Sequence, residues 1–198
     1  MVINVQKARI NTAGAYICLD GYYLFAIGIQ THNGQIPIIR LGGHREEGET
    51  GWRCAAREVY EETNLRIQPL MPQMTYVCDW DRIDTELQEI QWLPKFEGEP
   101  IPILVVTYRR ENKMHLSLMY LAQAKGAPTP SSEVIGLLSL TPEEIHRLCQ
   151  EPVTLEQCLH RGGRAILNAE FETSLVLEPF VQLRLLSRIL SLQSETKP

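Results

Sequence analysis

The sequence lacks the cysteine spacing of disulfide-stabilised and zinc-binding proteins. Its five cysteines are odd in number and include no C-x-x-C pair; they are Cys18, Cys54, Cys78, Cys149 and Cys158. Such a set argues against a disulfide framework and against a structural zinc site. Free thiols are typical of a reducing compartment, so we expect a cytoplasmic protein whose cysteines are small core residues.

Long apolar runs and an excess of positive charge are also missing. No stretch approaches the roughly 18 apolar residues that suggest a membrane span, and the N-terminus Met1–Lys7 lacks the charged start and apolar run of a signal peptide. The net charge of -5 gives no support to general nucleic-acid binding, which needs a basic face. Nucleotide binding stays open, because a bound metal ion can mask phosphate charge.

What the chain does have is enough apolar material for one core. Its 198 residues fit one domain, and 44% of them are hydrophobic against 22% charged, as in ordinary soluble proteins. No internal repeat, low-complexity tract or linker divides the sequence. We therefore expect a single domain over 1–198, with C-terminal helices in 141–198.

Three strands are predicted near the start. Ala13–Leu19 and Tyr22–Gln30 flank an Asp-Gly pair at 20–21, a strong hairpin signal. A third strand is predicted at Ile36–Leu41. Pro37 within it predicts a position near a sheet edge, because proline cannot donate to the ladder.

The middle of the chain is harder to assign. Residues 66–100 hold several prolines, two tryptophans and an acidic cluster, so we expect a long excursion with one strand near Met74–Cys78. Two more strands, Pro102–Arg109 and Met114–Ala122, are predicted around a polar turn at 110–113.

Three helices are predicted toward the C-terminus. Thr141 to Glu144 combines a capping box with proline at the first helical position, and Thr154 to Gln157 is a second capping box. Pro179 opens a third helix, Phe180–Leu192, whose wide apolar face fits either the core or a homodimer contact. This order of strands and helices predicts an α+β or mixed α/β/α architecture.

A glycine-rich loop, 42–48, precedes a helix that we expect from Thr50 to Glu62. Thr50 can cap its start. Glu58, Glu61 and Glu62 follow i, i+3, i+4 spacing and point to one side of a helix. Their repulsion costs roughly a few tenths of a kcal/mol per pair on an exposed helix. A divalent cation reverses that cost, and oxygen ligands suit Mg²⁺ or Mn²⁺; the alternative is a solvated helix face.

The neighbours of these carboxylates fit the same interpretation. Arg57 can neutralise part of the cluster, and Glu49 can reach Arg57 if the loop folds back. Gly42 and Gly43 allow the backbone to approach a ligand closely. Free amides there and at the start of the helix suit a phosphate.

Together these residues resemble the Nudix box, G-x5-E-x7-R-E-U-x-E-E-x-G-U, where U is bulky and aliphatic. The match runs from Gly43 to Leu65, and every fixed position agrees except one: Asn64 stands where the family has glycine. Asparagine is the next-best residue for a left-handed helix cap, so the change affects the cap and no ligand.

The resemblance implies a fold and a reaction. The fold is a Nudix-like α/β/α sandwich of the α+β class with a mixed β-sheet, here with a short helical C-terminal extension. The reaction is a pyrophosphohydrolase reaction: metal-activated water cleaves a diphosphate in a nucleoside diphosphate linked to another group, X. The implied metal ligands are Glu58, Glu61, Glu62 and the carbonyl of Gly42.

The resemblance also implies catalytic residues. Glu61 is implied in catalysis, with Glu49 and Arg57 as the supporting pair. The general base of the family lies outside the box, and our candidate is Glu133; the acidic cluster between Asp79 and Glu89 is the alternative. Independently of the resemblance, their positions in or next to the glycine loop make Gly43, His44 and Arg40 candidates for substrate binding; for His44 and Arg40 the alternative is an exposed side chain without a ligand.

The tryptophans and the competing functions leave alternatives open. Trp52 is expected to pack, whereas Trp80 and Trp92 could either pack or stack on a base. A nucleotide-binding sensor that does not cleave its ligand is the alternative function, although an intact carboxylate set argues against it. Diphosphate isomerase chemistry on the same fold is a third candidate function. The partner is a small nucleotide or other diphosphate, and the box does not identify the substrate.

Overall fold

The centre of the molecule is a twelve-stranded mixed sheet built around β1 (Arg9–Leu19). The computed structural model describes residues 8–29, 33–84, 87–92, 98–111, 113–168 and 170–195. β1 pairs in parallel with β9 (Lys113–Ala124) and antiparallel with β2 (Tyr22–Ile27) and β4 (Leu41–His44). The sheet therefore contains both strand directions, as expected.

The remaining strands extend the sheet on both sides of β1. Beyond β2 lie β10 (Gly136–Leu140) and β11 (Arg164–Leu167); beyond β9 lie β8 (Leu104–Arg110), β6 (Thr75–Asp79) and β7 (Gln88–Ile90). Off this path, β3 (Ile36–Ile39) pairs with β2 and with β12 (Leu177–Pro179), and β5 (Ile67–Pro69) pairs with β9.

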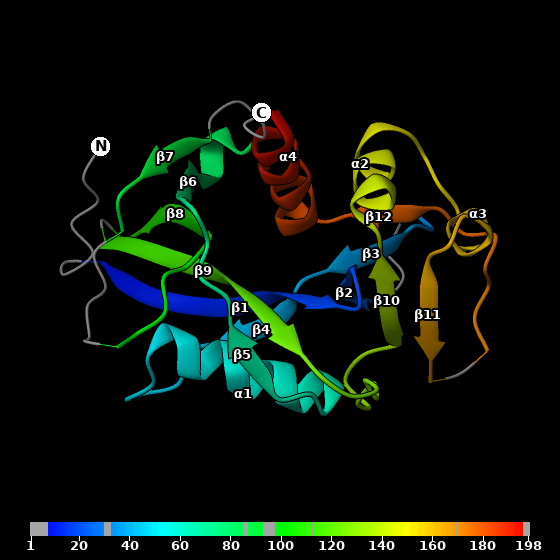
Figure 1. The fold of residues 1–198 in the computed structure, drawn as a ribbon, viewed down its shortest axis with the longest axis horizontal. Helices are drawn as coiled ribbons and strands as arrows, with labels where there is room; N and C mark the ends of the chain where they lie inside the picture. The colour runs from blue at the N-terminus through cyan, green and yellow to red at the C-terminus, as the bar shows by residue number, and fades with distance from the viewer. Residues whose placement is uncertain are drawn as a thin grey trace.

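Helices cover both faces of this sheet (Figure 1). The helix α1 (Gly51–Thr63) lies against one face, whereas α2 (Pro142–Gln150), α3 (Leu155–His160) and α4 (Val181–Glu195) lie on the other side. β1 shows why two layers form. Its Ala15 and Ile17 pack with Val59 of α1, whereas Tyr16 between them packs with the core under α2 and α4, because alternate side chains of a strand face opposite sides. The predicted α/β/α sandwich is confirmed.

The predicted strands agree with the structure apart from their ends. Residues Gln30, Glu86 and Asn112, which belong to predicted segments, lie outside the described residues. The predicted third strand is divided at Arg40 into β3 and β4. Within the described ranges, no helix combines the length and apolarity needed to cross a membrane.

The predicted edge position of Pro37 is wrong, because β3 has a neighbour on each side. The bonds with the β12 segment use Ile36, whose amide donates to Val176, and Ile38, whose carbonyl accepts from Phe180. Pro37 itself only accepts, from the amide of Gly28 at 2.9 Å. The strand therefore does not need the N–H that proline lacks.

The C-terminal region is not simply a helical extension. Both predicted capping residues, Thr141 and Thr154, cap their helices, but β11 and β12 lie between the helices and join the sheet. Most of the apolar face of α4 is buried in the core, where Leu183, Leu185 and Ile189 have no exposed surface, whereas Leu192 near the end of the helix is 37% exposed. That face therefore supplies no argument for a homodimer.

Candidate active site

The helix α1 forms where its capping residues predict. The Thr50 hydroxyl accepts a hydrogen bond from the Arg53 amide at 3.2 Å. At the other end Asn64 has φ 57° and donates its amide to the Tyr60 carbonyl at 2.8 Å. Cys54 and Val59 are buried against the sheet, which leaves the carboxylates of the box on the side that faces β4.

The glycines of β4 allow its backbone to lie directly against this carboxylate side. The Gly42 amide donates to Oε2 of Glu62 at 2.8 Å. A Cβ atom on Gly42, where φ is 136°, would overlap the backbone of Gly14 and Ala13, so glycine is required there by conformation and by close approach. A Cβ atom on Gly43 would overlap the Glu58 carboxylate, which is the movable end of a side chain.

Arg57 connects most of the charged groups in the site. It forms a two-pronged ion pair with Glu49, with Nε–Oε1 at 2.8 Å and Nη2–Oε2 at 3.0 Å. Its Nη1 donates to Glu58 at 2.9 Å and to Glu61 at 3.0 Å. Its Nη2 also donates to the His44 carbonyl at 3.0 Å. The hydrogen bonds from Arg57 lower the pKa of Glu49, so the predicted supporting pair is formed.

Glu62 is the most strongly perturbed carboxylate of the box. Its pKa is raised to about 7, mainly by burial, and the charges of Glu58 and Glu133 contribute in the same direction. The Gly42 amide and Arg40 act in the opposite direction. Burial also lowers the pKa of the Arg40 guanidinium, which the charge of Glu62 partly offsets. These residues therefore share one electrostatic environment, and a cation placed there would relieve the repulsion among the carboxylates.

The loop before β10 brings Glu133 into this environment. The Ser131 amide donates to the Glu62 carbonyl at 3.0 Å, and the Thr129 amide donates to the Thr63 carbonyl at 2.9 Å. Asn168 holds the same loop by donating its side-chain amide to the Ser131 carbonyl at 2.7 Å. The loop containing Glu133 is therefore fixed at the end of α1, although its role as base stays a prediction.

The acidic residues between Asp79 and Glu89, the alternative to Glu133 as general base, make separate structural contacts. Asp79 accepts from the Thr107 hydroxyl at 3.2 Å and from the Asp81 amide at 3.1 Å. Asp84 forms an ion pair with Arg184 at 3.0 Å, and Glu89 lies on β7. Only Asp81 among these residues lines the pocket described below.

The carboxylates are not gathered as a ready-made metal site. In the described part of the chain, no group of three His, Cys, Asp or Glu side chains is arranged to hold a metal ion. Arg57 accounts for this arrangement, since it holds Glu58 and Glu61 itself. The donor set still fits Mg²⁺ or Mn²⁺, because it consists of oxygens whose charges repel one another around Glu62. Glu58 and Glu61 would have to turn from Arg57 toward the cation.

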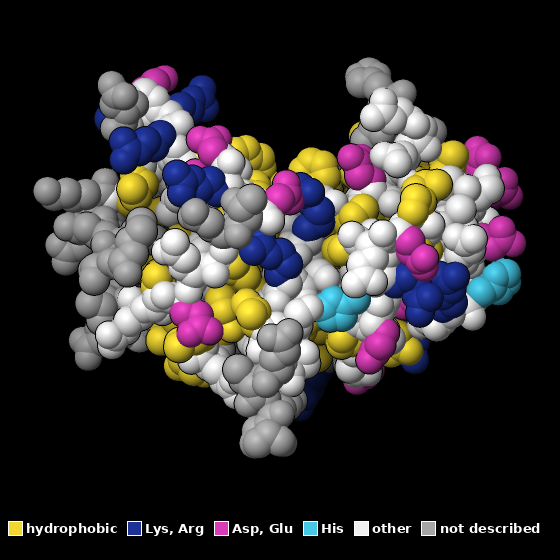
Figure 2. Space-filling model, turned by 90° about the horizontal axis from the view of Figure 1, so that it is seen from above, with side chains coloured by type: hydrophobic (Ala, Val, Ile, Leu, Met, Phe, Trp, Pro, Cys, Tyr) yellow, Lys and Arg dark blue, Asp and Glu magenta, His cyan; other side chains and the backbone are white. Residues whose placement is uncertain are grey.

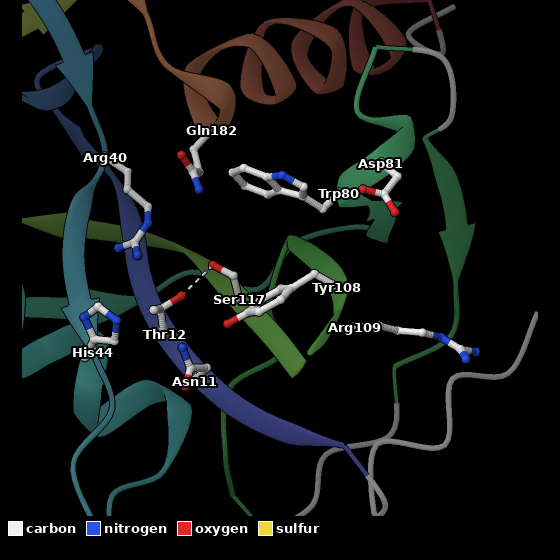
Figure 3. A pocket seen from close by; sticks show the side chains of 10 residues that line it. All are labelled: Asn11, Thr12, Arg40, His44, Trp80, Asp81, Tyr108, Arg109, Ser117 and Gln182. Atoms are coloured by element: carbon white, nitrogen blue, oxygen red, sulfur yellow. Dashed lines mark hydrogen bonds between the residues drawn. The ribbon is translucent and has the colours of Figure 1, made fainter. Parts of the chain in front are cut away.

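A pocket of about 380 Å³ opens beside the glycine loop (Figure 3). Arg40 and His44 line it on one side, and Trp80, Tyr108 and Gln182 line it on the other. Its floor includes Thr12, whose hydroxyl donates to the Ser117 hydroxyl at 2.8 Å. Sequence reasoning missed Tyr108 and Gln182, which come from a strand and a helix without any motif.

The other tryptophans pack in the core. Trp52 meets Tyr120 edge to face, with ring centroids 5.4 Å apart, as expected for a packing residue. Trp92 is only 8% exposed and belongs to the core beside α1. Of the two tryptophans considered for base stacking, only Trp80 lines the pocket, and it is 46% exposed.

Comparison with known proteins identifies the family. The model of the NUDIX domain matches residues 11–157. A NUDIX family hydrolase from Clostridium perfringens shares 17% identity at a TM-score of 0.49, covering 92% of this chain and 96% of that chain. A NUDIX hydrolase from Nitrosomonas europaea shares 17% identity at a TM-score of 0.44, and the match covers 70% of this chain and 77% of that chain. An Ap4A hydrolase from C. elegans shares 19% identity at a TM-score of 0.40, and the match covers 70% of this chain and 84% of that chain. The family match spans most of the chain and includes the whole box, so the chain belongs to the NUDIX domain family.

Proposed function

We propose that this protein hydrolyses, with Mg²⁺ or Mn²⁺, a diphosphate bond in a nucleoside diphosphate linked to another group. One observation carries the proposal: Glu58 and Glu62 face the Gly42–Gly43 backbone at contact distance while Arg57 holds Glu49. Glu49, Arg57, Glu58 and Glu62 thus lie beside one loop, Glu61 is joined to them through Arg57, and the loop borders the pocket through His44.

Each residue has a role that its contacts support. Glu58, Glu61, Glu62 and the Gly42 carbonyl would hold the cation, which supplies charge neutralisation and a water of lowered pKa. Arg57, braced by Glu49, orients Glu58 and Glu61. Arg40 and His44, which line the pocket beside the glycine loop, would contact the phosphates. Glu133 would accept the proton of the attacking water as general base.

The surroundings support a small-molecule substrate and a reducing compartment. On the face shown in Figure 2, basic and acidic side chains are interspersed, without one broad basic surface of the kind that binds nucleic acid. The five cysteines are free thiols, of which Cys54, Cys78 and Cys158 are buried. These thiols support a cytoplasmic location as part of the proposal.

The test is a phosphate-release screen with Mg²⁺ over nucleoside triphosphates, nucleotide sugars, dinucleotides and non-nucleotide diphosphates. We expect turnover of at least one nucleotide class, its loss on adding EDTA, and its loss in Glu62→Gln. Glu156→Gln, an exposed glutamate on α3, is the matched control and should keep full activity. Turnover of no compound would favour the sensor alternative, and turnover unaffected by Glu62→Gln would refute the metal assignment.

A further inference from the structure

The pocket has two chemically different ends (Figure 3). Arg40 and His44 lie at the end that adjoins the glycine loop, where phosphate would be cleaved. The aromatic rings of Trp80 and Tyr108 lie at the opposite end. A substrate whose diphosphate lies at the box therefore places its remaining group between or against these rings.

Contacts outside the pocket hold both aromatic rings in position. Trp80 begins the short helix η2 (Trp80–Arg82), which Asp79 caps by accepting from the Asp81 amide at 3.1 Å. Tyr108 stacks on its cross-strand partner His115, with centroids 5.3 Å apart and planes 19° apart. Tyr108 also lines the pocket, so its ring is supported on one side and available on the other. Pre-positioned rings stack on a planar ligand with little loss of side-chain entropy.

The helix α4 completes this end of the pocket, although it lies beyond the residues matched by the family model. Gln182 directs its side-chain amide toward the space in front of Trp80 (Figure 3). Its backbone is fixed because the Tyr16 hydroxyl donates to the Gln182 carbonyl at 2.7 Å. An amide offers both a donor and an acceptor, which matches the edge of a nucleobase.

The same helix braces the turn that carries Trp80. Arg184 forms an ion pair with Asp84 at 3.0 Å, and Arg188 donates to the Ile83 carbonyl. Both contacts are made just after η2. The position of Trp80 therefore depends on α4 as well as on β6, the strand that leads into η2.

We propose that Trp80, Tyr108 and Gln182 recognise an aromatic base of the substrate, and that α4 is a specificity element of this enzyme. The inference rests on the proposed function and deepens it. The pocket volume of about 380 Å³ lies within the range of roughly 300–1,000 Å³ usual for small-molecule sites. Trp80 and Tyr108 supply stacking, whereas Gln182 supplies the polar contact that distinguishes one base from another.

The test is binding of compounds that contain no phosphoanhydride. Adenosine, guanosine, cytidine and uridine 5′-monophosphates and ribose 5-phosphate are titrated by calorimetry into the full-length protein with Mg²⁺. At least one nucleotide should bind about fivefold or more tightly than ribose 5-phosphate, which corresponds to one stacked base. Trp80→Ala should remove this difference, and Trp80→Phe should keep most of it.

Three further variants separate recognition from positioning. Gln182→Leu should change the preference among the four nucleotides, whereas Arg184→Ala should weaken all four about equally and Arg184→Lys should restore them in part. Phe180→Ala removes an exposed aromatic ring near the same end of α4 and should leave binding unchanged. Circular dichroism and cooperative melting establish that each variant is folded.

Two results would overturn the inference. One is equal binding of ribose 5-phosphate and every nucleotide, including no binding of any; the other is tighter binding of a nucleotide than of ribose 5-phosphate that survives Trp80→Ala. Neither result depends on hydrolysis, so the proposed function would still be judged by its dependence on Glu62. Conversely, base-dependent binding without turnover would support this inference and refute the hydrolase proposal.

Discussion

At the scale of single residues, Arg57 shows why the box contains a basic residue among its acids. Its fork holds Glu49 through two nitrogens and also reaches Glu58 and Glu61. A lysine has the same charge but a single point of attachment, so it cannot make these contacts together. The role of this residue is therefore geometric as well as electrostatic.

The variant Arg57→Lys tests this distinction. We expect turnover to fall on the order of 10–100-fold, as for other residues that orient metal ligands. The free energy of unfolding should fall by about 1 kcal/mol, because the ion pairs are partly solvent-screened. Steady-state kinetics and urea unfolding measure the two effects. Arg53→Lys, an exposed arginine on the same helix, is the control; comparable activity in both variants would contradict the geometric role.

Glu62 predicts a pH dependence of stability in metal-free protein. Its pKa is raised to about 7 in the folded state, whereas an unfolded chain has the ordinary value near 4.3. Between these values the folded state keeps a proton that the unfolded state has lost, so the free energy of unfolding falls as pH rises. The loss should be on the order of 1–2 kcal/mol after solvent screening.

The measurement is urea unfolding in EDTA at intervals from pH 4 to 8. The difference between wild type and Glu62→Gln isolates this group, because glutamine does not titrate. As pH rises from about 4.3 to about 7, the free energy of unfolding of the wild type should fall relative to that of Glu62→Gln, and above this window the two profiles should run parallel. Profiles that stay parallel throughout would show that burial does not raise this pKa.

At the scale of secondary-structure elements, α1 depends on its two caps. Asn64 has φ 57°, a conformation that costs most residues about 1–2 kcal/mol but costs glycine little. Asn64→Gly should therefore keep activity and raise the free energy of unfolding by up to about 1 kcal/mol. Thermal melting and turnover measure this, with Asn64→Val as the comparison that should be destabilised. Loss of activity in Asn64→Gly would mean that this side chain does more than end the helix.

This element could be predicted because its signals are local. Thr50, the carboxylate spacing and Asn64 all act within one or two turns of their partners, and the glycine pair acts on the adjacent helix. The charged residues of the box are thus placed on and beside α1 and connected through Arg57, and their role as a metal site stays a prediction. Arg57 adds a contact with the His44 carbonyl that no pattern indicates.

The elements that were missed depend on contacts distant in sequence. β12 has only three residues and forms because β3 lies beside it. β11 alternates exposed with half-buried residues rather than polar with apolar ones. Tyr108 and Gln182 become pocket residues only when β8 and α4 are placed in space. A single sequence holds no periodic signal for such arrangements.

At the scale of the whole molecule, we propose that 1–198 folds as one domain, although the family model ends at residue 157. The buried residues of α4 pack with those of α2, α3 and the sheet in a continuous core. A chain ending at Pro179 loses the four fully or almost fully buried side chains Leu183, Leu185, Leu186 and Ile189. At about 1.5–3 kcal/mol each, this loss approaches the total stability of a typical domain, about 5–15 kcal/mol.

We therefore expect the shortened chain to show no cooperative thermal transition and to bind a dye specific for exposed apolar surface. Leu192→Ala, which changes a 37% exposed residue of the same helix, should melt cooperatively near the wild-type temperature. A cooperative transition in the shortened chain would show that α4 is an appendage rather than part of the domain.

The pairing of β3 with β12 also bears on how the enzyme is made. The strand that leads into the glycine loop meets this partner only about 140 residues later in the chain. During synthesis the N-terminal hairpin and the box helix leave the ribosome well before that partner and α4 exist. The nascent chain can hold all the carboxylates of the box and still lack the finished pocket, so activity should begin only after the last helix has emerged.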